Sequence, residues 1–207
     1  MSYLTAALYD TLIAHAERLC LTAYRKSMLA PLEGRVLELG SGTGKNLPYY
    51  STQLERLVLS EPDPHMRKRL RTRLAEYSTS AVIELSEASA EQLPFASSEF
   101  DQVVSTLVYC SVTNLRQSLA ETYRVLAPGG TLTLMEHIAA PLGTGRRRWQ
   151  ERLDPIWSRA TGGCHLNRDP RLILRELGFH ETSVALDDLR GAPGFQKLLL
   201  CGTWQKA

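Results

Sequence analysis

The chain has 207 residues, of which 43% are hydrophobic, and a formal net charge of +2, which together indicate one soluble globular domain. The near balance of charge argues against a broad basic face for nucleic acid, and no apolar run approaches the roughly 20 residues of a membrane span. The amino terminus shows no signal pattern, and the four cysteines (20, 110, 164 and 201) lack metal-ligand spacing. We therefore expect a cytoplasmic protein without a metal.

Helix-like and strand-like segments alternate along the chain. Residues 3–29 carry apolar side chains at helical spacing, and residues 31–34 break that helix. Strands are then expected at 35–40, 55–60, 81–86, 100–107 and 131–138, and helices at 44–50, 64–77, 114–126 and 169–177. Pro128-Gly129-Gly130 is expected to end the helix at 114–126. Such alternation predicts a mainly parallel sheet with helices on both faces.

Two more strand-like runs, 180–187 and 195–204, follow with a short turn region between them. So short a connection requires antiparallel pairing. Residues 139–168 have no clear period and are interpreted as a cap beside the carboxyl edge of the sheet. The expected fold is α/β and doubly wound, with a Rossmann-like seven-stranded sheet whose last strand is antiparallel. The expected divisions of this single domain are 1–30, 31–138, 139–168 and 169–207.

A glycine loop follows the first expected strand, in the sequence Val-Leu-Glu-Leu-Gly-Ser-Gly-Thr-Gly at 36–44. Its G-x-G-x-G spacing differs from the dinucleotide fingerprint, and Asn46 occupies the Ser/Thr position of a P-loop. The acid Glu38 suits a ligand with a cationic or zwitterionic end. Glu61 ends the second expected strand, where an acid can accept hydrogen bonds from ribose hydroxyls.

Several ordered motifs together resemble the class I S-adenosylmethionine-dependent methyltransferases: E-L-G-S-G-T-G, the acid at 61, A-E-Q-L-P-F, F-D-x-V-V and R-V-L-A-P-G-G. The resemblance implies S-adenosylmethionine as cofactor, S-adenosylhomocysteine as product and no metal. It places Glu38, Gly40, Gly42 and Gly44 at the methionyl end and Glu61 at the ribose. The adenine would lie against Ser89, Ala90 and Glu91, although many relatives have Asp in place of Ser89. Thr106 and Leu107 would lie under the sulfonium.

A narrower resemblance concerns the acceptor side. The segments T-L-V-Y-C-S-V (106–112), M-E-H-I (135–138), L-D-P-I-W (153–157) and G-C-H-L-N-R (163–168) are similar to the alkyl thiol methyltransferases of the methyltransferase-like-seven group. This resemblance implies a small thiol as acceptor, although the hydrophobic amino-terminal segment of that group is missing. Tyr9-Asp10 and L-P-Y-Y (47–50) resemble small bacterial phospholipid N-methyltransferases. A lipid or small amine acceptor therefore stays an alternative, with the run Arg146–Arg148 contacting the membrane.

A thiol acceptor reacts as its thiolate, so a base or cationic neighbour is expected at the site. His137, at the carboxyl end of the fifth expected strand, titrates in the required range. Neighbouring Glu136 is the other catalytic candidate, but adjacent strand residues face opposite ways, so one of the two is expected to be structural.

Five further residues are candidates for contact with the acceptor: Tyr9, Tyr109, Asp154, Trp157 and His165. Four of them have a simpler interpretation. Tyr9 and Trp157 could serve packing, Asp154-Pro155 could begin a helix, and His165 could be a satisfied loop residue. Cys110 is interpreted as a small buried residue. A domain that binds the cofactor without catalysis is the remaining alternative. The expected partner is a small-molecule acceptor, for a monomer or a homodimer.

Overall fold

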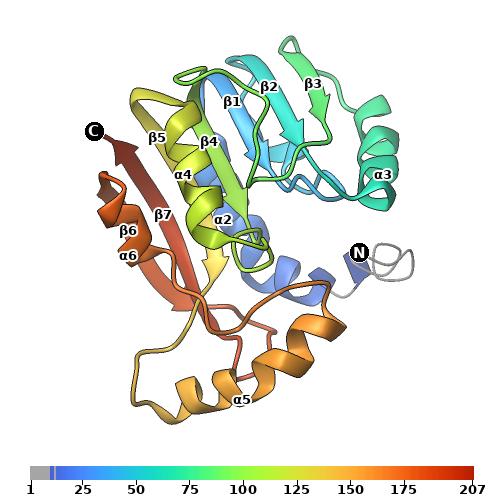
Figure 1. Ribbon diagram of the computed structural model, residues 1–207. Coiled ribbons are helices and arrows are strands. Elements are labelled where there is room, and N and C mark those ends of the chain that lie inside the picture. Colours follow the sequence, from blue (N-terminus) through green and yellow to red (C-terminus); the bar gives the residue numbers. More distant parts are fainter. Residues whose placement is uncertain (1–9, 12) are drawn as a thin grey trace.

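A computed structural model describes residues 10, 11 and 13–207 and contains one seven-stranded sheet in the order β3-β2-β1-β4-β5-β7-β6 (Figure 1). The strands are β1 (Gly34–Leu39), β2 (Leu54–Ser60), β3 (Val82–Ser86), β4 (Phe100–Thr106), β5 (Leu126–His137), β6 (Phe179–Asp188) and β7 (Leu198–Lys206). β7 lies antiparallel to both of its neighbours, whereas the pairs from β3 to β5 are parallel. The expected fold class is confirmed.

The helical elements are η1 (Glu17–Leu21), α2 (Thr22–Leu29), η2 (Leu47–Tyr49), α3 (Pro64–Ala75), α4 (Leu115–Val125), α5 (Gly145–Ala160) and α6 (Arg171–Glu176). The π-helical turn η1 runs directly into α2. Asp63 caps α3 by accepting from the N–H groups of His65 and Met66, and Pro64 occupies the first turn. No helix among residues 10, 11 and 13–207 is long and apolar enough to span a bilayer.

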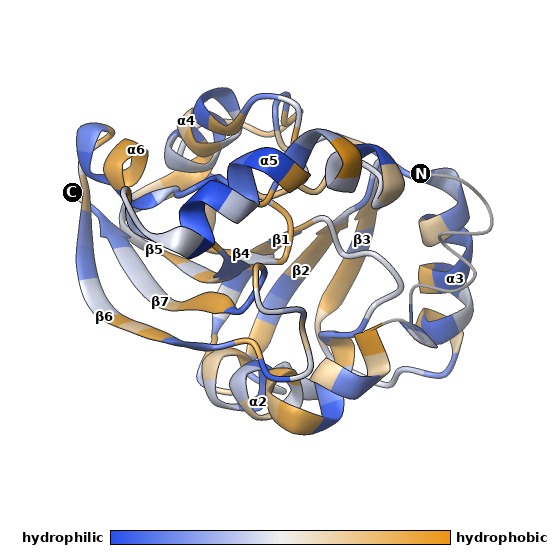
Figure 2. Ribbon diagram, turned by 90° about the horizontal axis from the view of Figure 1, so that it is seen from below, coloured by the Kyte–Doolittle hydropathy of each residue, from blue (hydrophilic) through white to orange (hydrophobic). Residues whose placement is uncertain are grey.

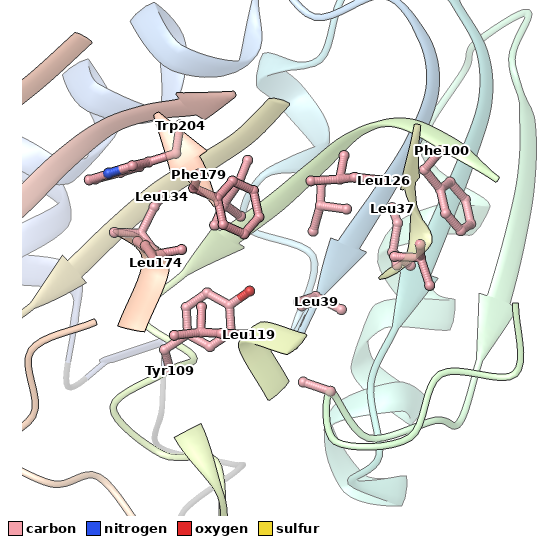
Figure 3. Close-up of a cluster of buried hydrophobic side chains, with 14 of the residues drawn as sticks. Leu37, Leu39, Phe100, Tyr109, Leu119, Leu126, Leu134, Leu174, Phe179 and Trp204 are labelled. Atoms are coloured by element: carbon pink, nitrogen blue, oxygen red, sulfur yellow. The ribbon is translucent and has the colours of Figure 1, made fainter. Parts of the chain in front are cut away.

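The two faces of the sheet pack against different helices because successive side chains of a strand point to opposite faces. On one face, Leu37 and Leu39 of β1 pack with residues of α4, α6 and the other strands; Figure 3 labels ten members: Leu37, Leu39, Phe100, Tyr109, Leu119, Leu126, Leu134, Leu174, Phe179 and Trp204. On the other face, Val36 packs with Leu29 of α2 and Leu70 of α3. This two-sided burial accounts for the four consecutive buried residues at the end of β1, of which only Glu38 is charged.

Two expectations about local structure are wrong. Pro128-Gly129-Gly130 lies inside β5 and does not end the helix; Phe100 pairs with Leu126 and Gln102 pairs with Thr131, so the extra residues form an irregularity in the strand. The cap contains the sixteen-residue helix α5, in which Pro155 is internal and Thr144 is the N-cap. Asp154 therefore does not begin a helix. The expected division of the chain into four parts stays a prediction.

Candidate active site

A cavity of about 760 Å³ lies at the carboxyl ends of the parallel strands. Gly40 follows β1, Glu61 follows β2, Leu107 follows β4 and His137 ends β5, and all four contribute to the wall. Helix α5 lies across this end of the sheet and contributes Trp157 (Figures 1 and 2). The chain continues from β1 to β2 and from β4 to β5, and β2 and β5 lie on opposite sides of the neighbouring pair β1 and β4. The cavity therefore lies at the switch point of the sheet, where ligands bind in such folds.

The glycine loop brings bare backbone to the cavity wall. Gly40 and Gly42 both have a positive φ (+54° and +56°). A Cβ atom on Gly40 would lie 2.7 Å from Val108 Cγ2, whereas a Cβ on Gly42 would find only Gly40 O, at 3.8 Å. Gly42 thus leaves open space that a ligand can use. Gly44 lies outside the wall and packs against Leu70 and Leu47.

Glu61 is held at the wall by two backbone donors. The Gly42 N–H donates to Oε2 (2.8 Å) and the Asp63 N–H to Oε1 (2.9 Å). Burial raises the pKa of Glu61, and these donors oppose that rise. Arg67 Nη1 donates to the carbonyls of Glu61 (2.8 Å) and Pro62 (2.7 Å), which fixes the turn after β2. The carboxylate is therefore rigid and still faces the cavity.

Glu38 lies beneath the glycine loop. Tyr50 OH donates to its Oε2 (2.6 Å) and Asn46 Nδ2 to its Oε1 (3.1 Å). Burial raises the pKa of Glu38 to about 7. Thr106 joins the same network, accepting from Asn46 Nδ2 (3.1 Å) and Arg25 Nη1 (3.2 Å). Glu38 and Thr106 line a second space of about 20 Å³ beside Gly40 and Gly42, and neither lines the large cavity.

The amino-terminal helical segment secures this network from outside. Arg25 is 3% exposed and forms an ion pair with Glu17 (2.8 Å). Asp10 accepts from Thr43 Oγ1 (2.7 Å) in the glycine loop and pairs with Arg73 of α3 (3.0 Å). The segment thus fixes both the underside and the rim of the loop.

The expected adenine residues Ser89, Ala90 and Glu91 all line the cavity. Glu91 Oε1 accepts from the Thr113 N–H (2.6 Å), which ties this loop to the loop after β4. Leu107 also lines the cavity, at a φ of +60° that is rare for a residue with a side chain. Its N–H donates to Met135 O (2.8 Å), which keeps this strained position on the sheet.

Adjacent Glu136 and His137 do face opposite ways. Glu136 Oε1 accepts from Ser105 Oγ (3.0 Å) and from the N–H groups of Val108 (2.7 Å) and Tyr109 (2.9 Å), and burial raises the pKa of its carboxyl. Glu136 therefore supports the loop after β4 and does not line the cavity, so it is the structural member of the pair. His137 lines the cavity.

The imidazole of His137 contacts a thiol. Its Nε2 lies 2.9 Å from Cys164 Sγ, while its Nδ1 has no hydrogen-bond partner among the residues that the structure describes. Burial opposes a charged imidazole, but the interactions with Cys164 and Glu136 outweigh burial and raise the pKa of His137. A hydrogen bond from Cys110, together with His137, lowers the pKa of Cys164 to about 4. The imidazole and the thiol thus shift each other's pKa in opposite directions.

Residues 37–134 match the family model described as a methyltransferase domain. The chain carries a methyltransferase domain. The glycine loop, Glu61 and the adenine-side loop all fall inside the matched residues, whereas His137 and the cap follow them. This match confirms the family resemblance inferred from the sequence motifs.

Known proteins similar in sequence to this chain are also methyltransferases by name. Thiol S-methyltransferase TMT1B of Rattus norvegicus is 36% identical over 153 residues, 73% of this chain and 62% of that relative. Phosphatidylethanolamine N-methyltransferase of Cereibacter sphaeroides is 34% identical over 112 residues, 53% of this chain and 54% of that relative. The chain thus spans less than two thirds of the length of either relative.

A Thermotoga maritima structure, described as a SAM-dependent methyltransferase and possible histamine N-methyltransferase, has a TM-score of 0.68 at 20% identity. It covers 99% of this chain and 98% of its own. At that identity the similarity shows the fold alone.

The cavity of the methyltransferase domain fits the expected S-adenosylmethionine. Its volume of about 760 Å³ falls within the roughly 300–1,000 Å³ of small-molecule sites. The open space at Gly42 and the fixed carboxylate of Glu61 lie side by side, joined by a hydrogen bond of 2.8 Å. Ala90, Glu91 and Leu107 complete the wall between the adenine end and the sulfonium position that the resemblance implies.

Of the residues expected to contact the acceptor, some line the cavity and others do not. Trp157 lines the cavity and packs edge-on against Phe195 at 5.2 Å between ring centroids. Tyr109 belongs to the hydrophobic core, with its hydroxyl 2.7 Å from Thr122 Oγ1, so the expected substrate contact is wrong. Asp154 and His165 pair with each other (2.9 Å) and are not part of the cavity wall, so their contact with substrate stays a prediction. Tyr9 lies outside the described residues.

Three parts of the cavity wall were missed from the sequence. Cys164 and Cys110 lie beside His137, and the segment 189–193 between β6 and β7 closes one side. The cysteines have no motif spacing, because each follows a different element. The signal that could have found them is their place after the expected fourth strand and within the cap.

Proposed function

We propose that the protein transfers the methyl group of S-adenosylmethionine to the sulfur of a small thiol. The observation that carries this proposal is one cavity whose wall holds Gly42 and Glu61, after β1 and β2, together with His137 at the end of β5 and Cys164 after α5. The relative TMT1B, which is named a thiol S-methyltransferase, supports the same chemistry.

The protein's own residues would bind, orient and exclude water. Glu61 would accept hydrogen bonds from the ribose hydroxyls, Gly40 and Gly42 would let the methionyl part touch the backbone, and Ala90 and Glu91 would contact the adenine. The cofactor supplies an already activated methyl group, so positioning accounts for much of the catalysis. The acceptor sulfur would enter beside the imidazole of His137, which lines the cavity at the end of β5.

Methyl transfer from isotopically labelled cofactor to a panel of thiols, amines and phenols tests this proposal. We expect product from thiols, and a reduced kcat/KM for His137→Asn with thiol acceptors. Leu172→Ala, at an exposed position of α6 that is not part of the cavity wall, is the matched control. Turnover of amines alone would contradict the thiol assignment and would favour the amine or phospholipid alternative.

We also propose weak contact with an anionic membrane surface through α5. Leu142, Trp149 and Ile156 are 81%, 57% and 69% exposed. Trp149 and Ile156 are seven residues apart and so share one helix face, next to the exposed cations Arg148 and Arg152. Exposed apolar side chains flanked by arginine are typical of interfacial helices.

Sedimentation with vesicles tests this contact. We expect the wild type to pellet with anionic vesicles at low salt, and Trp149→Ala to pellet less. The control Leu172→Ala removes an exposed leucine of α6 (66% exposed) and should pellet as the wild type does. Equal behaviour of the two variants would refute the contact.

A cytoplasmic location and a monomeric or homodimeric state stay predictions, which cell fractionation and sedimentation velocity would decide.

A further inference from the structure

Three potential metal ligands converge in the acceptor half of the cavity. Cys110 Sγ, Cys164 Sγ and a ring nitrogen of His137 all lie within 4.8 Å of one another. Cys110 lies in the loop after β4, Cys164 in the segment after α5, and His137 at the end of β5. We propose that these three side chains bind a soft divalent cation, with zinc as the favoured ion, and leave its fourth position open to the acceptor thiol.

The donor set matches the chemistry of zinc. Thiolate sulfur and imidazole nitrogen are the ligands that zinc prefers, and catalytic zinc sites keep three protein ligands and one open position. Zn–S bonds of about 2.3 Å at tetrahedral angles place two sulfurs about 3.8 Å apart. Ligand atoms already within 4.8 Å need only small shifts to reach that geometry.

Hydrogen bonds to backbone carbonyls join the two segments that carry Cys110 and Cys164. The His165 N–H donates to Cys110 O (2.7 Å), and Arg168 Nη1 donates to the carbonyls of Tyr109 (3.2 Å) and Cys110 (3.3 Å). Gly163 lets the cap approach, because a Cβ there would lie 3.1 Å from Ser111 O. The cap segment is thus fastened to the loop after β4 at the positions of the two cysteines.

The cluster is buried but open on one side. Cys110 and His137 are 4% and 3% exposed, and all three side chains line the large cavity. A cation bound by them would therefore face the space where the acceptor must lie. The other two cysteines, Cys20 and Cys201, belong to a separate buried cluster with Met135 and Leu199.

The proposed cation specifies how the thiol of the proposed function is activated, and this part of the inference rests on that function. The acceptor sulfur binds the fourth position, its S–H bond breaks and the proton goes to water. The bound thiolate then forms the new S–CH3 bond, the sulfonium C–S bond breaks, and the cofactor leaves as a neutral thioether. The methylated acceptor is also a neutral thioether, a weaker ligand than a thiolate, and so leaves the cation. In this step His137 is a ligand that holds the cation beside the acceptor sulfur.

Cobalt spectroscopy tests the site directly. The full chain is reduced, freed of metal with a chelator, and titrated with Co²⁺ and then Zn²⁺. We expect one equivalent to bind, with a thiolate-to-cobalt charge-transfer band that Zn²⁺ displaces. Cys110→Ser, Cys164→Ser and His137→Gln should each weaken binding by at least about 100-fold, the upper end of the effect of changing an outer partner of a metal ligand.

Cys20→Ser is the matched control. Cys20 is a buried cysteine whose thiol donates to Ala16 O, an interaction that serine can retain. This variant should bind Co²⁺ as the wild type does. Circular dichroism and cofactor binding of every variant establish that it is folded. Addition of 2-mercaptoethanol to the cobalt form should change the band, because the open position admits a thiol.

Several outcomes would overturn the proposal: no stoichiometric binding by the reduced wild type, or equal binding by the ligand variants. A Cys110–Cys164 disulfide in air-exposed protein, with no metal binding after reduction, would do the same. Full thiol methylation by metal-free protein overturns the metal and leaves the proposed function intact. A bound metal without thiol methylation overturns the proposed function and leaves the metal site intact.

Discussion

Among single residues, Glu61 matters most for the cofactor end of the cavity. Its two carboxylate oxygens accept from the glycine loop and from the turn before α3, so one side chain fixes both segments that should enclose the ribose and methionine. Glu61 therefore holds two segments of the cavity wall together and also places a carboxylate at the cavity.

Glu61→Gln tests that double role. The amide keeps one acceptor oxygen for the backbone but loses the charge, and hydrogen bonds to charged groups contribute about 1.5–3 kcal/mol. We expect the dissociation constant for S-adenosylmethionine, measured by isothermal titration calorimetry, to rise by roughly 10- to 100-fold. Glu55→Gln, at an exposed position of β2, should leave it unchanged. Wild-type affinity in Glu61→Gln would remove Glu61 from the cofactor site.

Glu38 makes stability depend on pH. Burial raises its pKa in the folded protein to about 7 from 4.5, which corresponds to roughly 3 kcal/mol at 1.36 kcal/mol per pKa unit. Below pH 4.5 the carboxyl is protonated in both states. Between pH 4.5 and about 7 it is ionised in the unfolded chain but protonated in the folded one, so this group lowers stability as the pH rises.

Urea unfolding at several pH values measures the effect. We expect Glu38→Gln to gain stability relative to the wild type between pH 5 and 8, by up to about 3 kcal/mol. Tyr50→Phe removes the donor that lowers the Glu38 pKa, so it should steepen the pH dependence instead. A difference between Glu38→Gln and wild type that does not vary with pH would contradict the raised pKa.

Residue types at strand ends could be predicted from the sequence, but their directions could not. Glu136 and His137 are both polar and adjacent, and only the pleat decides that His137 reaches the cavity. Tyr109, in turn, points into the core because Thr122 of α4 offers its hydroxyl a partner there. The glycine loop and Glu61 were easier to predict from the sequence, because glycine marks a special backbone conformation and Glu61 comes directly after an expected strand.

Among the elements, α5 shows why the cap could not be predicted. Its buried residues are Gln150 and Asp154, both polar, while Trp149 and Ile156 are exposed, so no apolar periodicity marks the helix. Gln150 replaces apolar packing with hydrogen bonds to Ala140 N (2.7 Å) and Phe195 O (2.9 Å). The strands were located within a few residues, apart from the irregular start of β5. The central strands β1 and β2 are buried over most of their length, whereas β6 is largely exposed.

Gly163→Ala tests the contact between the cap and the loop after β4. Gly163 has a φ of +104°, and an added Cβ would lie 3.1 Å from Ser111 O. Gly143→Ala is the matched control, with a φ of +81° and no atom within 4 Å of the added Cβ. Both variants carry backbone strain of about 1–3 kcal/mol. We expect urea unfolding to show a larger loss for Gly163→Ala, and thiol methylation to fall in that variant alone. Equal losses would mean that the approach at Ser111 is unimportant.

At the scale of the whole molecule, the cavity joins parts that are distant in the chain. Its wall takes residues from the amino-terminal helical segment, the strand ends, the cap and the segment 189–193 between β6 and β7. A ligand that touches all of these should stabilise the entire fold, because it binds only when they are assembled.

Thermal unfolding with cofactor measures this coupling. S-adenosylmethionine at 100 times its dissociation constant should add about 2.7 kcal/mol, and a chain of this size gains roughly 2–4 °C per kcal/mol. We therefore expect Tm to rise by about 5–10 °C. Glu61→Gln at the same cofactor concentration is the control and should show a smaller rise. No shift in the wild type would contradict cofactor binding to the assembled cavity.

The position of β7 between β5 and β6 has a consequence during synthesis. Residues 131–137 of β5 pair with β7 on one side, and that pairing partner begins only at Leu198. While the ribosome is still making the segments between them, the nascent chain carries an apolar strand with an open edge, which is a template for aggregation. We expect truncations before residue 198 to need chaperones to remain dispersed.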